Sequence, residues 1–268
     1  MGTENRTKAD LTRQIITLVV IIGASVVANI LGMAMGETDT GNIANETFND
    51  TVYFFPATFV FATIWPVIYL GIMGLAIHQA LPSQAVNPRY RRGGYMLAIN
   101  LVLNAAWVWV FGGQFFTASF IVILPIMVTG VLAYAWLGVA RSPGAPGAER
   151  VLKVSVGMYT AWLTIATVAN ASAALAAGGW NGFGLAYETW GVIMLIVGIG
   201  LGLILYLLFR DPAFPFVYMY AYAGILVRRI GEVQAIATAA AIGAGLFLVL
   251  LLLSLIFRGK LAAGAART

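Results

Sequence analysis

The sequence contains no cysteine and one histidine, His78, among its 268 residues. The lack of cysteine excludes disulfides, thiolate catalysis and iron–sulfur clusters. A zinc site needs three or four nitrogen, sulfur or oxygen ligands, which this sequence does not gather, so we expect no metal site. His78 as an axial haem ligand stays open as an alternative to a polar group at a helix end.

Charge is also scarce, because Asp, Glu, Lys and Arg make up 9% of the chain while hydrophobic residues make up 61%. So few polar residues cannot cover the surface of a soluble globular domain. The mean hydropathy is +0.90, and several apolar runs reach the roughly 20 residues needed to cross a bilayer. We therefore predict an all-α, polytopic membrane helix bundle, because a β-barrel would show alternating segments of about ten residues.

The apolar runs carry no charged residue near their middles. Ionisable groups inside a membrane mark proton relays, ion-coupled transport and voltage sensing, so their absence argues against a proton-driven transporter. The lysines, Lys8, Lys153 and Lys260, lie at loop or terminal positions. We expect none of them to be buried as a retinal Schiff base would require.

The hydrophobic pattern predicts eight spans, of which the seventh is short and aromatic. Their ranges are 14–36, 53–79, 94–113, 117–140, 151–176, 186–209, 213–229 and 233–257. The first run has positive charges before it and could be a signal peptide, but it is longer than an ordinary signal-peptide core. Eight spans place both termini on the same side of the membrane.

The placement of charge favours cytoplasmic termini. With that orientation every Lys and Arg except Arg228 and Arg229 lies on the inner side, as the positive-inside rule expects. The outer loop 37–52 carries acidic residues and no basic one. This placement explains the net charge of +5 without a nucleic-acid partner, and we expect the bilayer of a bacterial inner (plasma) membrane to be the surroundings.

Aromatic and amide side chains recur at helical spacing in three of the predicted spans. They are Phe61, Trp65 and Tyr69 in the second, where Met73 continues the spacing, Asn100, Asn104 and Trp107 in the third, and Tyr159, Trp162 and Asn170 in the fifth. Residues three or four apart share a helix face. Such faces can join helices through hydrogen bonds, or line an apolar cavity for a flat ligand. Periodicity leaves both interpretations open.

The same three spans resemble motifs of the TspO/MBR family, the tryptophan-rich sensory proteins that include the mitochondrial translocator protein. The second-helix motif lies over residues 56–74, the third-helix motif over 103–113 and the fifth-helix motif over 158–170. Matching residues include Trp65, Tyr69, Leu103, Asn104, Trp107, Phe111, Gly113, Tyr159, Trp162, Ala166 and Asn170. The chain departs from the family pattern at Phe59, Thr63, Pro66 and Trp109.

The resemblance implies a five-helix unit over residues 1–177, followed by an extension of three spans over 178–268 in the same bundle. It also implies a pocket for a porphyrin, haem or similar flat hydrophobic ligand, with no cofactor required. The expected ligand-binding residues are Phe61, Trp65, Tyr69, Asn104, Trp107, Tyr159, Trp162 and Asn170. The outer loop 37–52 is a candidate lid.

We consider three functions, with a transporter that is not coupled to ions as a fourth alternative. The first is a membrane sensor or binding protein for a tetrapyrrole. The second is light-dependent porphyrin degradation, which the resemblance links to Trp65 and Trp162. The third is an accessory subunit of a larger pigment or respiratory complex; whether the chain forms a homodimer or joins such a complex stays open.

Overall fold

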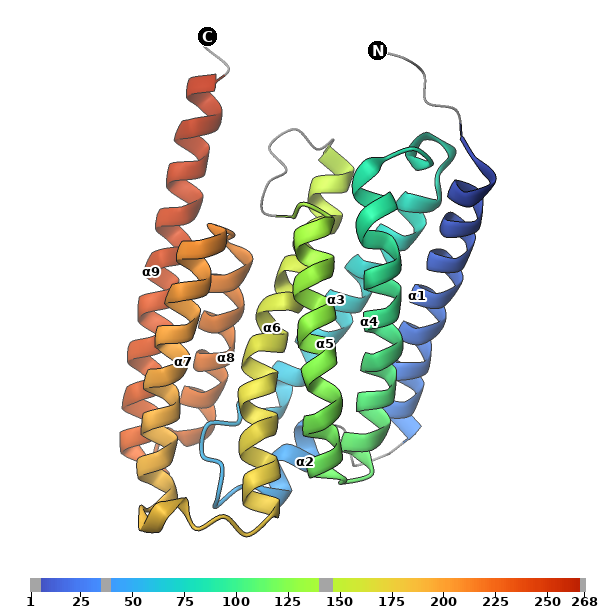
Figure 1. Ribbon diagram of the computed structural model, residues 1–268. Coiled ribbons are helices and arrows are strands. Elements are labelled where there is room, and N and C mark those ends of the chain that lie inside the picture. Colours follow the sequence, from blue (N-terminus) through green and yellow to red (C-terminus); the bar gives the residue numbers. More distant parts are fainter. Residues whose placement is uncertain (1–5, 35–39, 140–146, 266–268) are drawn as a thin grey trace.

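The computed structural model describes residues 6–34, 40–139 and 147–265, and every regular element in these ranges is a helix. Figure 1 shows the long helices running side by side in one bundle. The α-helices are α1 (Lys8–Ala34), α2 (Thr40–Thr47), α3 (Thr58–Ala80), α4 (Pro88–Gly112), α5 (Phe116–Trp136), α6 (Gly147–Ala177), α7 (Tyr187–Phe209), α8 (Ala213–Arg229) and α9 (Gln234–Ala265). Short 3₁₀ helices occupy Pro82–Gln84 and Gly182–Gly184.

Seven of the described helices are long and apolar enough to cross a membrane: α1, α3, α4, α5, α6, α7 and α9. The chain is therefore an integral membrane protein, as predicted. Helix α8 has the bounds predicted for the seventh span, but its 17 residues reach only about 26 Å at about 1.5 Å per residue. It runs beside α7 and α9, so that α1 begins and α9 ends at the same end of the bundle (Figure 1).

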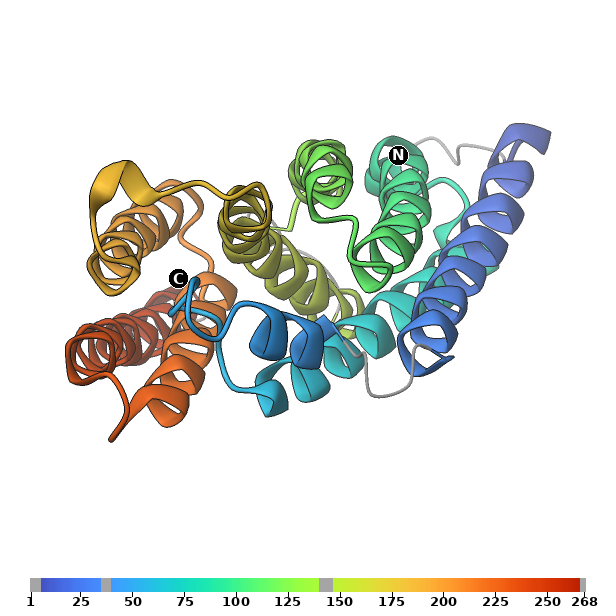
Figure 2. The ribbon, with the colours of Figure 1, turned by 90° about the horizontal axis from the view of Figure 1, so that it is seen from below.

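The helices form a larger and a smaller group. In the larger group, α4 packs against α1 and α5, while α6 packs against α3 and α5. In the smaller group, α7, α8 and α9 pack against one another, and α8 also packs against α6. Figure 2 shows the smaller group beside α6, on the side away from α1. The boundary predicted at residue 177 stays a prediction, because α8 belongs to both packing regions.

Helix α8 is the connection between the two groups. Its first half places Phe214, Val217 and Ala221 in the main apolar core. Tyr218 contributes to a second apolar cluster with Phe247 of α9. A buried carboxylate completes the junction, because Asp211 Oδ2 accepts a hydrogen bond of 2.9 Å from the Tyr134 hydroxyl of α5.

The second predicted span begins later than expected, at Thr58 rather than residue 53. Proline has no N–H and favours an extended conformation in the residue before it, and Ala57 after Pro56 is also extended, with φ −57° and ψ 148°. The chain therefore reaches α3 through a non-helical stretch. The predicted loop 37–52 also contains a helix, α2, which the polar sequence did not suggest. Residues 37–39 of that loop lie outside the described residues.

Other helix ends differ from the predicted bounds because helices continue into the charged interface. Helix α4 begins at Pro88 rather than residue 94, since Pro88 occupies the first turn and the Asn87 side chain accepts a 3.0 Å hydrogen bond from the Arg89 backbone N–H. Both features are typical of helix starts. Residues 35, 36 and 140, at the predicted ends of two spans, lie outside the described residues.

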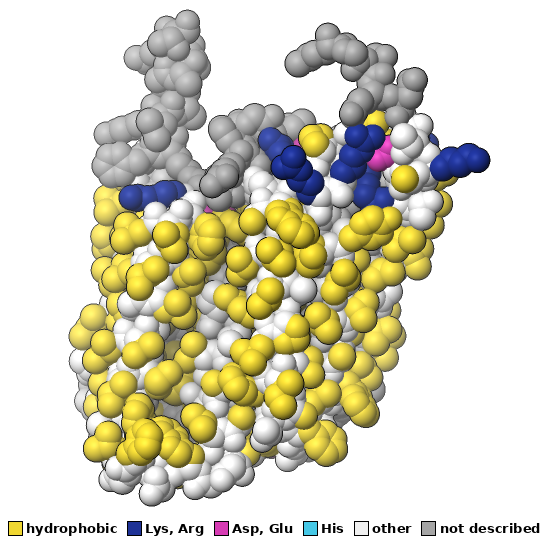
Figure 3. All heavy atoms as spheres, in the orientation of Figure 1, with side chains coloured by type: hydrophobic (Ala, Val, Ile, Leu, Met, Phe, Trp, Pro, Cys, Tyr) yellow, Lys and Arg dark blue, Asp and Glu magenta, His cyan; other side chains and the backbone are white. Residues whose placement is uncertain are grey.

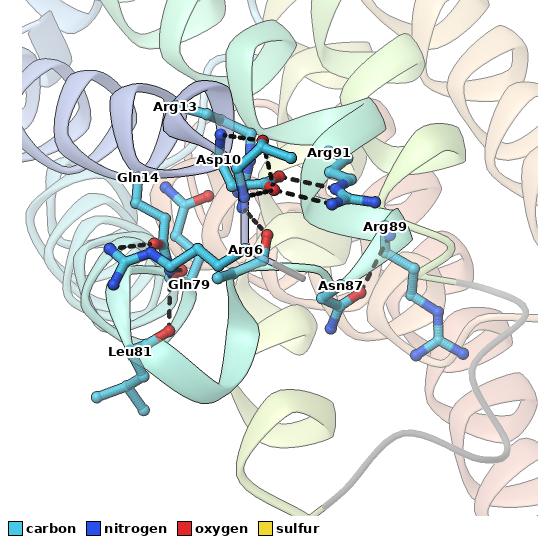
Figure 4. A network of polar contacts seen from close by, with 11 residues as sticks. Arg6, Asp10, Arg13, Gln14, Gln79, Leu81, Asn87, Arg89 and Arg91 are labelled. Atoms are coloured by element: carbon cyan, nitrogen blue, oxygen red, sulfur yellow. Dashed lines mark hydrogen bonds and ion pairs between the residues drawn. The ribbon is translucent and has the colours of Figure 1, made fainter. Parts of the chain in front are cut away.

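Basic side chains gather at one end of the bundle in Figure 3. Figure 4 shows that polar contacts tie the helices together there. Arg91 of α4 forms an ion pair of 2.7 Å with Asp10 of α1. The buried Arg13 side chain donates a 2.8 Å hydrogen bond to the Ala85 carbonyl. These contacts therefore join α1, α4 and the turn after α3 at this end.

Lys153 overturns the expectation that the lysines stay unburied. Its side chain is only 2% exposed, and its Nζ lies 2.6 Å from Glu149 Oε1, one turn earlier on α6. The same ammonium donates a 2.7 Å hydrogen bond to the Leu137 carbonyl. A carboxylate and a carbonyl thus replace the water that a buried ammonium loses. This burial could not be predicted from the sequence, since Lys153 lies at the end of a span.

Candidate functional site

The aromatic stripe of α3 faces α4 and α6 and forms the centre of one cluster. The Trp65 ring centroid lies 5.3 Å from that of Tyr69, on the next turn of α3. Three rings from the other helices surround it: Trp107 at 6.4 Å, Tyr159 at 6.2 Å and Trp162 at 6.2 Å. The sequence-predicted faces of the three spans therefore do converge in space.

One part of the cluster is closed and contains a hydrogen bond between two helices, and we call it the floor: Tyr69, Asn104 and Tyr159. The Tyr69 hydroxyl donates a 2.5 Å hydrogen bond to Asn104 Oδ1, which links α3 to α4. All three side chains are buried; Tyr159 has no measurable exposure, and its hydroxyl has no hydrogen-bond partner. Asn104 acts here as a helix-to-helix bond, which is the packing alternative considered for the sequence.

The opposite part, which we call the wall, consists of Phe61, Trp107, Trp162 and Asn170. Phe61 lies edge-on to Trp162, with ring centroids 5.6 Å apart. The indole N–H groups of Trp107 and Trp162 are buried without an acceptor, and so is the amide nitrogen of Asn170. The Asn170 oxygen accepts a 3.2 Å hydrogen bond from Ser119. A buried donor without a partner costs about 1–3 kcal/mol, so three together indicate a place for an acceptor.

A small cavity lies against the wall. Its volume is about 40 Å³, which is space for a few water molecules and not for a ring system. The lining includes five predicted site residues, Phe61, Trp65, Trp107, Trp162 and Asn170, together with Ala44, Phe54, Phe55, Pro56, Phe111, Ile165, Ala166 and Ala169. The three floor residues lie outside this lining.

Residues 40–57, which we call the lid, close the cavity at the end opposite the basic cluster. Helix α2 packs on α3, and the Asn45 side chain donates a 3.0 Å hydrogen bond to the Thr58 hydroxyl. Phe48 packs edge-on against Phe116, with ring centroids 4.7 Å apart. The lid is thus attached both to the start of α3 and to the start of α5.

The two arginines at the end of α8 hold the lid from the other side. Arg228 Nη2 donates hydrogen bonds of 2.9 Å to the Asn45 carbonyl and 2.8 Å to Asn49 Oδ1. Arg229, which is 1% exposed, donates to the backbone carbonyls of Asn49 at 2.8 Å and Tyr53 at 3.2 Å. Its guanidinium also lies 4.9 Å from the centre of the Tyr53 ring. These are the two basic residues predicted on the outer side.

Neither the lid side chains nor Phe111 were predicted from the sequence to line the cavity. Phe111 stood in the third-helix motif, so its signal was present but unused. Phe54 and Phe55 directly precede Pro56. An aromatic pair just before a helix start was the pattern that could have indicated a non-helical segment in the lining. Ala44 lies on α2, which the sequence did not predict, and nothing in its type indicated a role.

His78 contacts the neighbouring helix α4. Its Nδ1 lies 2.8 Å from the Tyr90 hydroxyl of α4. Within residues 6–34, 40–139 and 147–265, no group of three or more His, Asp or Glu side chains is placed to hold a metal ion.

The comparison with known families adds one match. The family of TSPO-like proteins matches residues 12–253, a range that includes the extension as well as the five-helix unit. Comparison with curated proteins and with solved structures found no match. The family match covers most of the chain and agrees with the membrane fold and with the motifs on α3, α4 and α6; the chain therefore belongs to the TSPO-like protein family.

Proposed function

We propose that this protein binds a flat, apolar ligand carrying oxygen acceptors, of the tetrapyrrole class, between α3, α4 and α6. The observation that carries the proposal is the set of unmatched donors on the wall, Trp107, Trp162 and Asn170. Native interiors leave few buried donors unpaired, and those that remain call for an explanation. A carbonyl or carboxyl edge would satisfy them while the ring stacks on Trp65.

Binding requires the pocket to enlarge. The cavity of about 40 Å³ is far below the roughly 300–1,000 Å³ of ordinary ligand sites. The floor is fixed by the Tyr69–Asn104 hydrogen bond, whereas the lid contributes Ala44, Phe54, Phe55 and Pro56 to the lining. Movement of the lid is the change that would admit a ring without breaking the contacts among the transmembrane helices.

The test is a titration of the purified protein with protoporphyrin, followed through the Soret band. We expect saturable binding, and replacement of both Trp65 and Trp162 by Ala should weaken it at least about 100-fold, or about 2.7 kcal/mol. The matched control replaces Trp109 and Trp136, which are 58% and 43% exposed, and should bind normally. Equal affinity of the two double variants would remove the proposed site.

The proposed light-dependent degradation shares this pocket and is separated by illumination. Trp65 and Trp162 meet edge to face at 6.2 Å, so a ring bound between them would contact both indoles. Loss of the Soret band in light that depends on both tryptophans would favour the enzyme. Binding without such loss would favour the sensor.

An accessory subunit is the second candidate, favoured by the filled interior of the aromatic cluster and by the exposed faces of α7 and α9. Large apolar side chains on these faces include Ile196, Ile204, Ile242 and Leu252, each more than half exposed. The test is copurification from membranes under mild solubilisation. A stable stoichiometric partner, together with no protoporphyrin binding, would favour the subunit over the sensor.

A further inference from the structure

A second and larger cavity lies between α6 and α7, on the side of the lid away from the aromatic cluster. Its volume is about 290 Å³, and we call it the crevice. Helix α8 packs against both α6 and α7 and thereby holds the two walls together. The residues that line it from the lid are Thr51, Val52 and Phe54.

The lining of the crevice suits a neutral apolar molecule. The α6 wall carries small side chains at Ala171, Ser172 and Ala176, and Gly191 faces them from α7. The Ser172 hydroxyl is already used, since it donates a 3.1 Å hydrogen bond within α6 to the Val168 carbonyl. A molecule that enters would therefore meet mainly hydrocarbon.

The mouth of the crevice is aromatic. Trp180 and Trp190 lie with ring centroids 5.1 Å apart, and both line the crevice with Tyr187. Their own polar groups bond locally, because the Trp190 indole donates to the Gly182 carbonyl at 2.6 Å and the Tyr187 hydroxyl to the Trp180 carbonyl at 3.2 Å. Aromatic residues of this kind collect where hydrocarbon meets the head groups, which indicates that this end of the crevice lies at the membrane interface.

Phe54 separates the crevice from the aromatic pocket. It lines both cavities, and α6 continues the partition with Ile165 and Ala169 on the pocket side and Val168 on the crevice side. Its neighbours Val52 and Phe55 are each 3% exposed, whereas Phe54 itself is only half-buried. The ring stands between two spaces on a non-helical segment, so a rotamer change can move it into the larger space.

We propose that the crevice is an access chamber: a flat, largely apolar, polycyclic molecule dissolved in the bilayer occupies it and passes Phe54 to reach the aromatic pocket. The occupant is inferred from continuity, because one side chain divides an apolar crevice open to lipid from a pocket lined with indoles. The hydroxyl of Thr51, which is buried without a partner, offers the occupant one polar contact. This inference rests on the proposed ligand class and adds the route by which such a ligand arrives.

The lack of native cysteine permits a test with single cysteines that needs no porphyrin. Ala169→Cys places a thiol in the aromatic pocket, and the full chain in phosphatidylcholine vesicles is treated with N-(1-pyrenyl)maleimide, a neutral flat reagent that dissolves in the bilayer. The labelling rate is compared with Phe54 intact, with Phe54→Ala, and with Ser172→Phe, which fills the crevice.

We expect Phe54→Ala to speed the labelling of Ala169→Cys about tenfold and Ser172→Phe to slow it by a similar factor, each about 1.4 kcal/mol of barrier. The control thiol is Ala161→Cys, since Ala161 is fully buried on α6 outside both linings. Its labelling should stay slow in all backgrounds. Equal acceleration at this position would mean general loosening and would overturn the proposal.

Two further results would contradict the access chamber. A labelling rate of Ala169→Cys that neither Phe54→Ala nor Ser172→Phe changes would place the route elsewhere, through the lid itself. A Ser172→Cys thiol that never reacts would show a crevice permanently filled by a lipid chain. A failed protoporphyrin titration, by contrast, removes the proposed ligand class and leaves these labelling rates to decide the route.

Discussion

The floor and the wall of the aromatic cluster are built from the same helices and differ in how their polar groups are satisfied. On the floor, the Tyr69 hydroxyl and Asn104 bond to each other, and the Tyr159 hydroxyl is left without a partner. On the wall, Trp107, Trp162 and Asn170 each bury a donor that has no acceptor. Residues of similar type thus stabilise the bundle on the floor and leave buried donors without acceptors on the wall.

This difference separates two roles that the sequence pattern had combined. A satisfied pair between helices contributes to stability whether or not a ligand is present. Unmatched donors lower stability until an acceptor arrives, which is the arrangement expected where binding rather than folding selects a residue. The opening of the site should therefore be on the wall side, where the lid lies, and the following variants test that division.

The largest effect should come from releasing the lid over the wall. Arg229→Gln removes a buried guanidinium that donates to the Asn49 and Tyr53 carbonyls, and hydrogen bonds to charged groups contribute about 1.5–3 kcal/mol. We expect backbone amides of the lid to exchange hydrogen at least about tenfold faster, while amides of the floor on α3 and α4 change little.

The matched control for this release is Arg92→Gln, which makes the same charge change at an exposed position at the opposite end. Its lid should exchange at the original rate. Uniform acceleration throughout the bundle in Arg229→Gln would show that the arginine stabilises the whole fold rather than the lid.

The floor should respond to Asn104→Leu with a loss of stability of about 1–2 kcal/mol, because the buried Tyr69 hydroxyl loses its acceptor in a membrane interior. Denaturant unfolding in detergent measures this loss. Adding Tyr69→Phe should restore part of it, since the hydroxyl left without an acceptor is then removed as well. No recovery in the double variant would argue against the hydrogen bond as the cause.

Much of the fold could be predicted from the sequence, because the hydrocarbon thickness sets the length of a membrane span and its backbone N–H and C=O groups must be hydrogen-bonded within the helix. Helical spacing placed Trp65, Trp107 and Trp162 on definite faces of their spans, and the resemblance to the family motifs implied that these faces line one pocket. The division into floor and wall could not be predicted, because it depends on which donors find acceptors across helices. The lid could not be predicted either, since Arg228 and Arg229 meet residues 45–55 only after the extension folds back against α3.

A substitution on the wall should weaken ligand binding without lowering the stability of the protein. Trp107→Phe removes one unmatched N–H and keeps an aromatic ring in the same place, so stability should stay equal or rise slightly. Affinity for protoporphyrin should fall about tenfold, or about 1.4 kcal/mol, if that N–H meets an acceptor on the ligand. The control is Trp109→Phe on the lipid-facing side of α4, which should alter neither property.

The smallest effect is expected at the junction of the two helix groups, where a satisfied hydrogen bond serves as a reference for the floor. Tyr134→Phe removes the 2.9 Å bond to Asp211 Oδ2, but the other carboxylate oxygen still accepts from the Ala213 N–H at 2.9 Å. The carboxylate therefore keeps a partner, and the loss should approach the average of about 0.6 kcal/mol for such bonds in membrane proteins. Denaturant unfolding should rank Tyr134→Phe below Asn104→Leu; the reverse order would mean that the connection through α8, and not the floor, limits the stability of the bundle.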